Sequence, residues 1–393
     1  MLGVRKVQQS RASTYYSRTF SRALLVLMLI LGLVWVLPSG SSIDPVPAVA
    51  GDWASGMAEH GASATAGKPG FLGWLPSAMA RTARTTDPPT PKPVEHWGWF
   101  TYKKQARKYL LHVPPKYESE GDKEYPLVVC LHGGGADIGF ARRMFCLGET
   151  AAKDGFIVAY PNGSGRLGNR FLTWNASQCC GFAKARKVDD VGFLKAFVEM
   201  VSKELKVDRQ RIYLVGFSNG AQMAYRLAAE APDTFAAVSI VSGSMSGREP
   251  APDKPVPIVI FHGTGDRHIP IAGGGGKLKK WGFDVHAKPL DYAVNFWVKV
   301  NGCEATPQIE EVNSQVTRTR YNHGKDGAEV ILYTLKGYGH SWPGGKRAWL
   351  FAEAPCRTFS ANDAMWDFFT KHTRTEFDVK QASDLDNAKC YRR

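Results

Sequence analysis

The chain has 393 residues and a formal net charge of +14, with 44% hydrophobic, 11% aromatic and 22% charged residues. These fractions are typical of globular proteins and exclude a chain that is disordered throughout. The positive charge is spread along the chain and no motif of a nucleic-acid-binding fold occurs, so nucleic acid is excluded as an expected partner.

The first 50 residues have the pattern of an export signal. A basic start precedes the apolar run 24–37 (LLVLMLILGLVWVL), which is short for a membrane span of roughly 20 residues and typical of a signal-peptide core. We predict a signal peptide or N-terminal membrane anchor over 1–50. Cleavage after 48–50 (AVA) would give a secreted or periplasmic protein, whereas an uncleaved segment would attach the protein to a membrane, with its folded part outside the cytoplasm.

A segment rich in Pro, Gly, Ala, Ser and Thr follows and ends in TTDPPTPKP. Such a composition cannot bury a core and favours extended chain. We therefore predict a disordered linker over 51–95, a catalytic domain over 96–375 and a C-terminal tail over 376–393.

From about His96 the sequence alternates short β-branched runs with helical patterns. This alternation predicts an α/β fold with a mostly parallel central sheet and helices on both faces. The predicted strands are 127–131, 157–160, 212–216, 237–241, 257–262 and 330–335, and the predicted helices are 189–206, 219–230, 290–300 and 361–371. Functional residues of such sheets lie at the carboxyl ends of the strands.

The pentapeptide 216–220 (GFSNG) stands directly after a predicted strand and opens a predicted helix. This is the setting of a nucleophile elbow, a sharp turn in which glycines leave room for neighbouring backbone and the serine projects above the sheet. We predict Ser218 as a nucleophile. The alternative is an ordinary serine that caps a helix.

Serine hydrolases built on this elbow place an acid and then a histidine downstream. Asp266 follows the run VPIVIFHGTGD on a Gly-rich loop, and His340 stands in the Gly-flanked loop KGYGHSWPGG after strand 330–335. His268 is too close to Asp266 in the sequence, and His372 ends a helix. Asp266 as a turn residue and His340 as a surface residue are the alternatives.

In the predicted chemistry, His340 takes the proton of Ser218 while Asp266 orients the imidazole ring. This chemistry requires neither a metal nor an organic cofactor, and no His/Cys cluster has the spacing of a zinc site. The segment 132–135 (HGGG) ends a predicted strand, where a second oxyanion donor is expected. We assign the oxyanion hole to the N–H groups of Gly134 and Asn219. A Gly-rich turn without a catalytic role is the alternative.

Read in order, these blocks resemble the polyhydroxybutyrate depolymerase/feruloyl esterase-type family of exported α/β-hydrolases. The resemblance runs from about Tyr109 to His372, through LHGGG, GFIVAYPNG, VDDVGFLKAFV, RIYLVGFSNGAQMAYRLA, VPIVIFHGTGD, GYGHSWPGG and DAMWDFFTKH. It implies the α/β-hydrolase fold and the same catalytic set. It also implies substrates such as phenolic-acid esters on plant polysaccharide, acetylated xylan or short hydroxyalkanoate oligomers. Trp174 and Trp342 are expected as aromatic walls of an acyl or sugar pocket, with buried packing as the alternative for Trp174.

The sequence is compatible with three functions. The first is an exported carboxylic-ester hydrolase that acts through an acyl-enzyme on polymer-linked or oligomeric esters. The second is an acyltransferase that uses the same nucleophile, with an alcohol in place of water. The third is a non-catalytic polymer-binding protein on the same scaffold, against which the intact set of Ser218, Asp266 and His340 argues.

Overall fold

A computed structural model describes residues 92–274, 287–348, 352–374 and 389–391 of the chain. They all belong to one compact unit, 83–393. The predicted signal or anchor over 1–50 and nearly all of the linker over 51–95 lie outside the described residues. Within the described ranges, no helix is both long and apolar enough to cross a bilayer.

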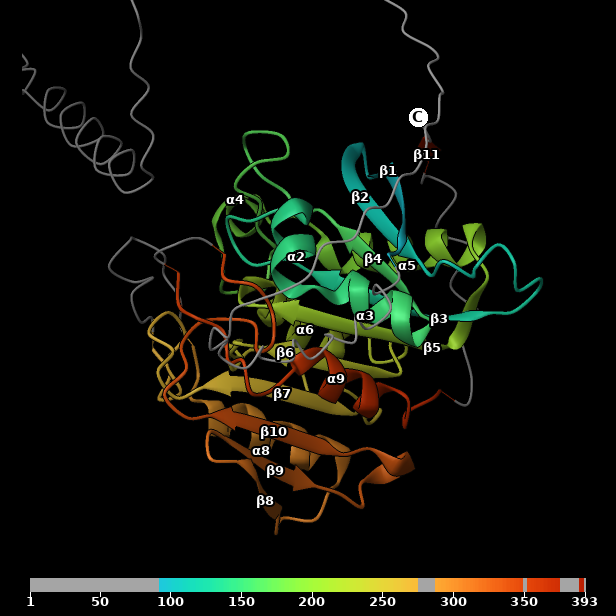
Figure 1. Cartoon of the computed structure of the whole chain (residues 1–393). Helices are drawn as coiled ribbons and strands as arrows, with labels where there is room; N and C mark the ends of the chain where they lie inside the picture. The colour runs from blue at the N-terminus through green and yellow to red at the C-terminus, as the bar shows by residue number, and fades with distance from the viewer. Residues whose placement is uncertain (1–91, 275–286, 349–351, 375–388, 392–393) are drawn as a thin grey trace, which may run out of the picture. The chain divides into compact units, whose positions relative to one another are not determined.

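One sheet of eleven strands, in the order β11-β1-β2-β4-β3-β5-β6-β7-β10-β9-β8, forms the centre of this unit (Figure 1). The strands are β1 Val94–Tyr102, β2 Gln105–Val113, β3 Tyr125–Leu131, β4 Ile157–Pro161, β5 Val207–Phe217, β6 Ala237–Val241, β7 Ile258–Gly263, β8 Gln308–Asn313, β9 Val316–Tyr321, β10 Val330–Leu335 and β11 Lys389–Tyr391. The neighbouring strands from β4 to β10 in this order pair in parallel. Antiparallel pairs extend both edges.

Helices cover both faces of the sheet, as predicted. They are α2 Ile138–Phe145, α3 Leu147–Asp154, α4 Gly181–Ala185, α5 Asp190–Glu204, α6 Asn219–Glu230, α8 Leu290–Asn301 and α9 Ala361–Phe369, with a short 3-10 turn, η1, at Lys325–Gly327. The core on one face contains residues of α5, α6 and α8. The core on the other face contains residues of α2, α3 and α9.

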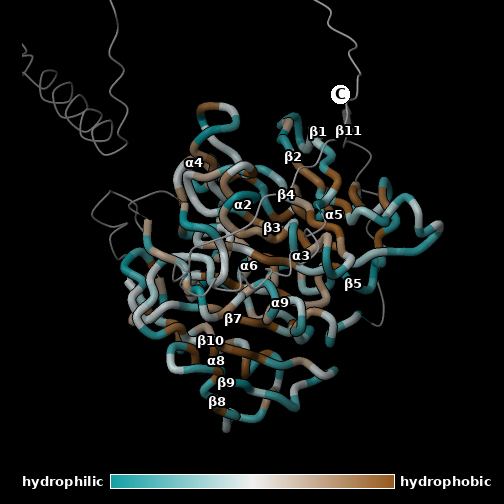
Figure 2. Tube along the Cα trace, viewed as in Figure 1, coloured by the Kyte–Doolittle hydropathy of each residue, from teal (hydrophilic) through white to brown (hydrophobic). Residues whose placement is uncertain are grey.

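The alternation of strand side chains explains these two cores. In β3, Leu127 and Val129 belong to the core with α5 and α6, whereas Val128 and Cys130 belong to the core with α2 and α9. Successive side chains of a strand point to opposite faces, so a strand that is apolar throughout must be covered on both sides. Figure 2 shows hydrophobic, brown stretches along the central strands. The α/β-hydrolase fold predicted from the sequence is confirmed.

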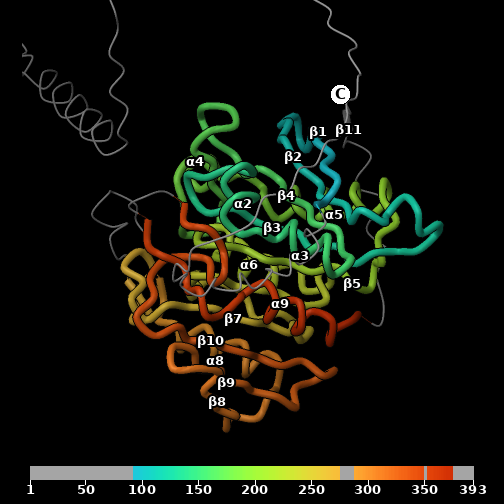
Figure 3. Tube along the Cα trace, in the orientation of Figure 1, coloured from blue at the N-terminus to red at the C-terminus, as the bar shows by residue number. Residues whose placement is uncertain are grey.

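The edge strands are where the structure adds to the sequence prediction. β1 and β2 form a hairpin at one edge, and β8 and β9 form another at the opposite edge. β8 is almost wholly exposed, so it has no apolar run that could identify it as a strand. In Figure 3 the orange β10 lies beside the yellow β7, although α8, β8 and β9 intervene in the chain.

Candidate active site

Ser218 lies at the turn between β5 and α6, at the carboxyl edge of the parallel strands. Its φ of 56° and ψ of −119° are an unfavourable conformation for a residue with a side chain. The turn is held because Ser218 N–H donates to Val241 O at 3.0 Å. A Cβ atom added to Gly216 would collide with the backbone of Gly220, so the close passage of chain through this turn requires glycine. The predicted elbow geometry is therefore present.

Asp266 lies on the turn after β7, and its side chain is buried, with 4% of the residue exposed. One carboxylate oxygen, Oδ1, accepts from the backbone N–H groups of His268 and Ile269, each at 2.8 Å. The other, Oδ2, lies 2.7 Å from His340 Nδ1. Burial raises the pKa of Asp266, but His340 and the other hydrogen-bonding neighbours outweigh it and lower the pKa overall. Asp266 is therefore a carboxylate at neutral pH.

His340 comes from the loop after β10, far from Asp266 in the sequence. Because its Nδ1 faces the carboxylate, the proton of the neutral ring belongs on Nδ1, which leaves Nε2 as an acceptor. The His340 ring lies 4.9 Å, centre to centre, from that of Phe217, the residue before Ser218. Its backbone N–H donates to the carboxylate of Glu353. The structure thus brings the predicted acid and base together, beside the elbow.

One neighbour of His340 is not predicted from the sequence. Glu353 holds the backbone of the His340 loop, but it lies 13 residues away in irregular chain, and no motif connects the two. His268, which is too close to Asp266 in the sequence to be the predicted base, has its ring centre 4.9 Å from that of His340, in a tilted arrangement. Asp266, His268 and His340 have donor atoms within 4.8 Å of one another, so they are close enough for a metal ion. The Asp266 carboxylate, however, already accepts hydrogen bonds on both of its oxygens.

The segment 133–135 turns over the start of α6, as an oxyanion loop requires. A Cβ on Gly134 would lie 3.3 Å from Asn219 Cβ, so the two predicted donors lie side by side. Gly134 N–H has no hydrogen-bond partner among the described residues. Asn219 opens α6, where the first N–H groups have no acceptor inside the helix. The two residues predicted as oxyanion donors are therefore neighbours, and their role stays a prediction.

The His132 side chain holds this loop in place through two hydrogen bonds. Its Nε2 accepts from Gly163 N–H at 2.9 Å, and its Nδ1 lies 2.8 Å from Gly133 O. Burial lowers the pKa of His132 to about 4, so the ring is neutral at pH 7 and can act as an acceptor.

Trp174 and Trp342 are both buried. This agrees with the alternative of buried packing for Trp174 and corrects the expectation that Trp342 forms the wall of an open pocket. They are 0% and 1% exposed. Trp174 Nε1 donates to His132 O at 3.0 Å, and Trp342 Nε1 donates to Asn362 Oδ1 at 2.9 Å. Each indole has satisfied its one donor inside the protein, so both tryptophans pack beneath the site instead of facing a substrate.

The backbone of Trp174 also makes two hydrogen bonds with the side chain of Asn219. Its backbone N–H donates to Asn219 Oδ1 at 2.8 Å, and its carbonyl accepts from Asn219 Nδ2 at 3.1 Å. The Asn219 side chain therefore fixes the segment around Trp174.

The chain is similar in sequence to known esterases. Residues 107–321 match the family model described as esterase PHB depolymerase. The chain is 31% identical to feruloyl esterase B of Piromyces equi over 63% of its own length and 45% of that protein's. It is 26% identical to feruloyl esterase C of Emericella nidulans, over 67% of the chain and 84% of that protein. A solved acetyl xylan esterase from Aspergillus awamori superposes with a TM-score of 0.46 and 16% identity, over 67% of this chain and 94% of that one. The chain spans less than half the length of feruloyl esterase B.

Proposed function

Because the chain belongs to the esterase PHB depolymerase family, we propose that it is a serine hydrolase of carboxylic esters, with Ser218 as nucleophile, His340 as general base and Asp266 as orienting acid. The observation that carries the proposal is the 2.7 Å contact between His340 Nδ1 and Asp266 Oδ2, beside a serine held in a strained turn. An ordinary capping serine has no need of that conformation or of that neighbour.

The proposed reaction proceeds in two steps through an acyl-enzyme. His340 Nε2 takes the proton of Ser218 as the serine oxygen attacks the ester carbonyl, and it then gives that proton to the leaving alcohol. Asp266 stabilises the imidazolium that forms in between. Water, activated by the same imidazole, then attacks the acyl-enzyme and releases the acid. No step requires a metal or an organic cofactor.

The carbonyl oxygen carries a negative charge in both tetrahedral intermediates. The backbone N–H groups of Gly134 and Asn219 are proposed to bind it. Donors that are already oriented, and need not reorganise, are each worth roughly 3 kcal/mol in the transition state. The contacts of His132 with Gly133 and Gly163 fix one side of this hole before substrate arrives.

The substrates proposed are polymer-linked or oligomeric esters, in line with the names of the similar proteins, which include feruloyl esterases. We also propose that the protein is exported, because of the apolar run 24–37 behind a basic start. If that segment is retained, it anchors the enzyme at a membrane.

The test is hydrolysis by the purified full chain of p-nitrophenyl esters, methyl ferulate, acetylated xylan and hydroxybutyrate oligomers, beside Ser218→Ala. Activity is expected with the wild type and a loss of roughly 10⁴-fold or more with Ser218→Ala. Ser202→Ala, a matched change on α5, should retain full activity. A fluorophosphonate probe should label the wild type and the Ser202→Ala variant, but not Ser218→Ala.

Equal hydrolysis by the wild type and Ser218→Ala would contradict the nucleophile. Transfer of the acyl group to an added alcohol in preference to water would indicate an acyltransferase. Binding of a polymer without turnover of any ester would indicate a non-catalytic protein.

A further inference from the structure

Two imidazole rings lie side by side at the candidate site. The ring centres of His268 and His340 are 4.9 Å apart, and both side chains are only partly buried, so a small solute can reach them. One donor atom each of Asp266, His268 and His340 lies within 4.8 Å of the other two. In the part of the chain that the structure describes, no other group of three or more His, Cys, Asp or Glu side chains meets this distance.

The Asp266 carboxylate orients one of these rings and holds the backbone of the other histidine. Its Oδ2 lies 2.7 Å from His340 Nδ1, which places the proton of the neutral ring there and leaves a lone pair on Nε2. Its Oδ1 accepts from His268 N–H at 2.8 Å. Histidines that bind zinc commonly donate their second ring nitrogen to a carboxylate in this way, and the ligating nitrogen becomes more basic. Asp266 can therefore support a metal ion without being a ligand.

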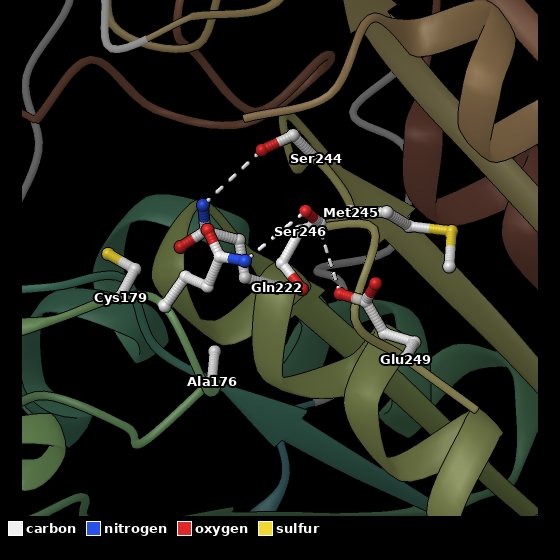
Figure 4. Close-up of a pocket in the computed structure, with 8 residues that line it drawn as sticks. Ala176, Cys179, Gln222, Ser244, Met245, Ser246 and Glu249 are labelled. Atoms are coloured by element: carbon white, nitrogen blue, oxygen red, sulfur yellow. Dashed lines mark hydrogen bonds between the residues drawn. The ribbon is translucent and has the colours of Figure 1, made fainter. Parts of the chain in front are cut away.

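The small pocket beside α6 lacks these features (Figure 4). None of the residues that line it is a histidine. Its one carboxylate, that of Glu249, accepts from the backbone N–H groups of Ser246 and Gly247, at 2.7 and 2.8 Å, so its charge holds the loop. Cys179 in its wall is bonded to Cys180 and offers no thiolate. The histidine pair is thus the better place for a transition-metal ion.

We propose that His268 and His340 together bind a divalent transition-metal ion such as Zn²⁺, with His340 as a ligand through Nε2 and Asp266 supporting it through Nδ1. Imidazole nitrogens are preferred ligands of Zn²⁺ and Cu²⁺, whereas Mg²⁺ and Ca²⁺ take oxygen ligands. Two nitrogens that bind one zinc ion at about 2.0 Å are roughly 3.3 Å apart. A modest rotation of the exposed His268 side chain brings the two rings to that separation, and water fills the remaining positions.

The bound metal acts as a reversible inhibitor. The lone pair of His340 Nε2 that binds it is the one that accepts the Ser218 proton in the proposed reaction. Inhibition therefore rests on the proposed esterase function, whereas metal binding does not depend on it.

The test measures zinc binding to the purified full chain by isothermal titration calorimetry, and p-nitrophenyl ester hydrolysis at the same zinc concentrations. The wild type should bind zinc and lose activity about tenfold or more at saturation, and EDTA should restore the activity. Mg²⁺ should neither bind nor inhibit. Ser218→Ala, which is expected to be inactive, should bind zinc as tightly as the wild type, so the site is measured independently of catalysis.

Two variants remove different parts of the site. His268→Gln should raise the Kd for zinc about tenfold or more, because it removes one of the two imidazole ligands. Asp266→Asn should raise it by about tenfold, since loss of a partner behind a ligating histidine typically has that effect. This second variant decides the question if His268→Gln fails to fold. His323→Gln, the matched change at an exposed histidine that pairs with Glu304, should leave the Kd unchanged.

Absence of zinc binding to the wild type, or a Kd that both site variants leave unchanged, would overturn the inference. Binding that persists in both variants would belong to other ligands, such as the thiols of Cys146 or Cys303. If the variants weaken binding but zinc leaves ester hydrolysis intact, the metal site stands and His340 is not the base. If the wild type hydrolyses no ester, the proposed function fails, and calorimetry of His268→Gln still decides the metal site.

Discussion

The candidate site has two halves that are held by different forces. The elbow half, residues 216–220, is held by backbone packed so closely that an added methyl group on either of its glycines collides with main chain. The acid–base half, Asp266 and His340, is held by hydrogen bonds between loops that are distant in the sequence. The elbow half should therefore be sensitive to volume, and the acid–base half to the loss of charge and hydrogen-bonding groups.

The largest expected effect comes from removing the charge of the acid–base half at constant volume. Asp266→Asn should lower kcat by roughly 10⁴-fold, because the amide no longer selects the His340 tautomer that accepts the serine proton. The protein should still fold, since the asparagine oxygen can accept from His268 and Ile269. Asp253→Asn, an exposed matched change, should have no effect on kcat.

The same variant has a pH signature. The pKa of Asp266 lies below its ordinary value of 3.8, so its contribution to stability is complete above that value and is lost as pH falls through the lower pKa of the folded state. Wild type and Asp266→Asn should thus differ most in the free energy of unfolding near neutral pH and converge in acid. A difference that grows as pH falls would contradict the ionised carboxylate.

The elbow half is tested by volume alone. Gly216→Ala should reduce the free energy of unfolding by about 3 kcal/mol, because the methyl group meets the fixed backbone of Gly220. Gly139→Ala in the first turn of α2 is the control, since its methyl group meets only side-chain ends at 3.3 Å. Chemical denaturation of both variants measures the difference. Equal stability of the two would mean that the elbow is looser than the structure describes.

The oxyanion loop belongs to neither half and depends on the neutral form of His132. Its pKa is lowered from 6.5 to about 4 by burial, so the unfolded chain binds the proton more readily. Stability should therefore rise by about 3 kcal/mol between pH 4 and 6.5 on account of this residue. His132→Gln should remove that part of the pH dependence in denaturation curves. An unchanged slope would show that the pKa of His132 is the same in the folded and the unfolded protein.

The smallest effect concerns Trp342, which lies under the elbow, 6.4 Å from the ring of Phe217. Trp342→Phe should cost about 2 kcal/mol of stability, because Asn362 Oδ1 loses its donor in a buried place. KM should stay the same for every ester of the panel. A large rise in KM with unchanged stability would restore the predicted role as a pocket wall.

The sequence predicts the parts of the fold that are apolar on both faces. The bounds of α6 and β6 agree with the prediction, and Asp266 and His340, chosen by chain order and strand ends, lie within hydrogen-bond distance in the structure. Their catalytic roles remain proposals. The edge hairpins were not predicted because an exposed strand such as β8 lacks an apolar run.

The direction in which the tryptophan side chains point could not be predicted, for a different reason. Trp174 and Trp342 are large, amphipathic residues next to predicted functional loops, and residue type alone does not tell an outward indole from an inward one. Glu353 could not be predicted because its contact with the His340 N–H is set by the tertiary fold. No short pattern in the chain encodes such contacts.

The position of β10 between β7 and β9 also sets the order in which the enzyme can be completed. During synthesis, which starts at the N-terminus, the elbow and the predicted oxyanion loop are made long before residues 330–340. If Asp266 and His340 act as proposed, a nascent fragment shorter than about 340 residues has the acid without the histidine and should not hydrolyse an ester. Activity should therefore appear late and abruptly during synthesis or refolding, when β10 pairs with β7 and β9.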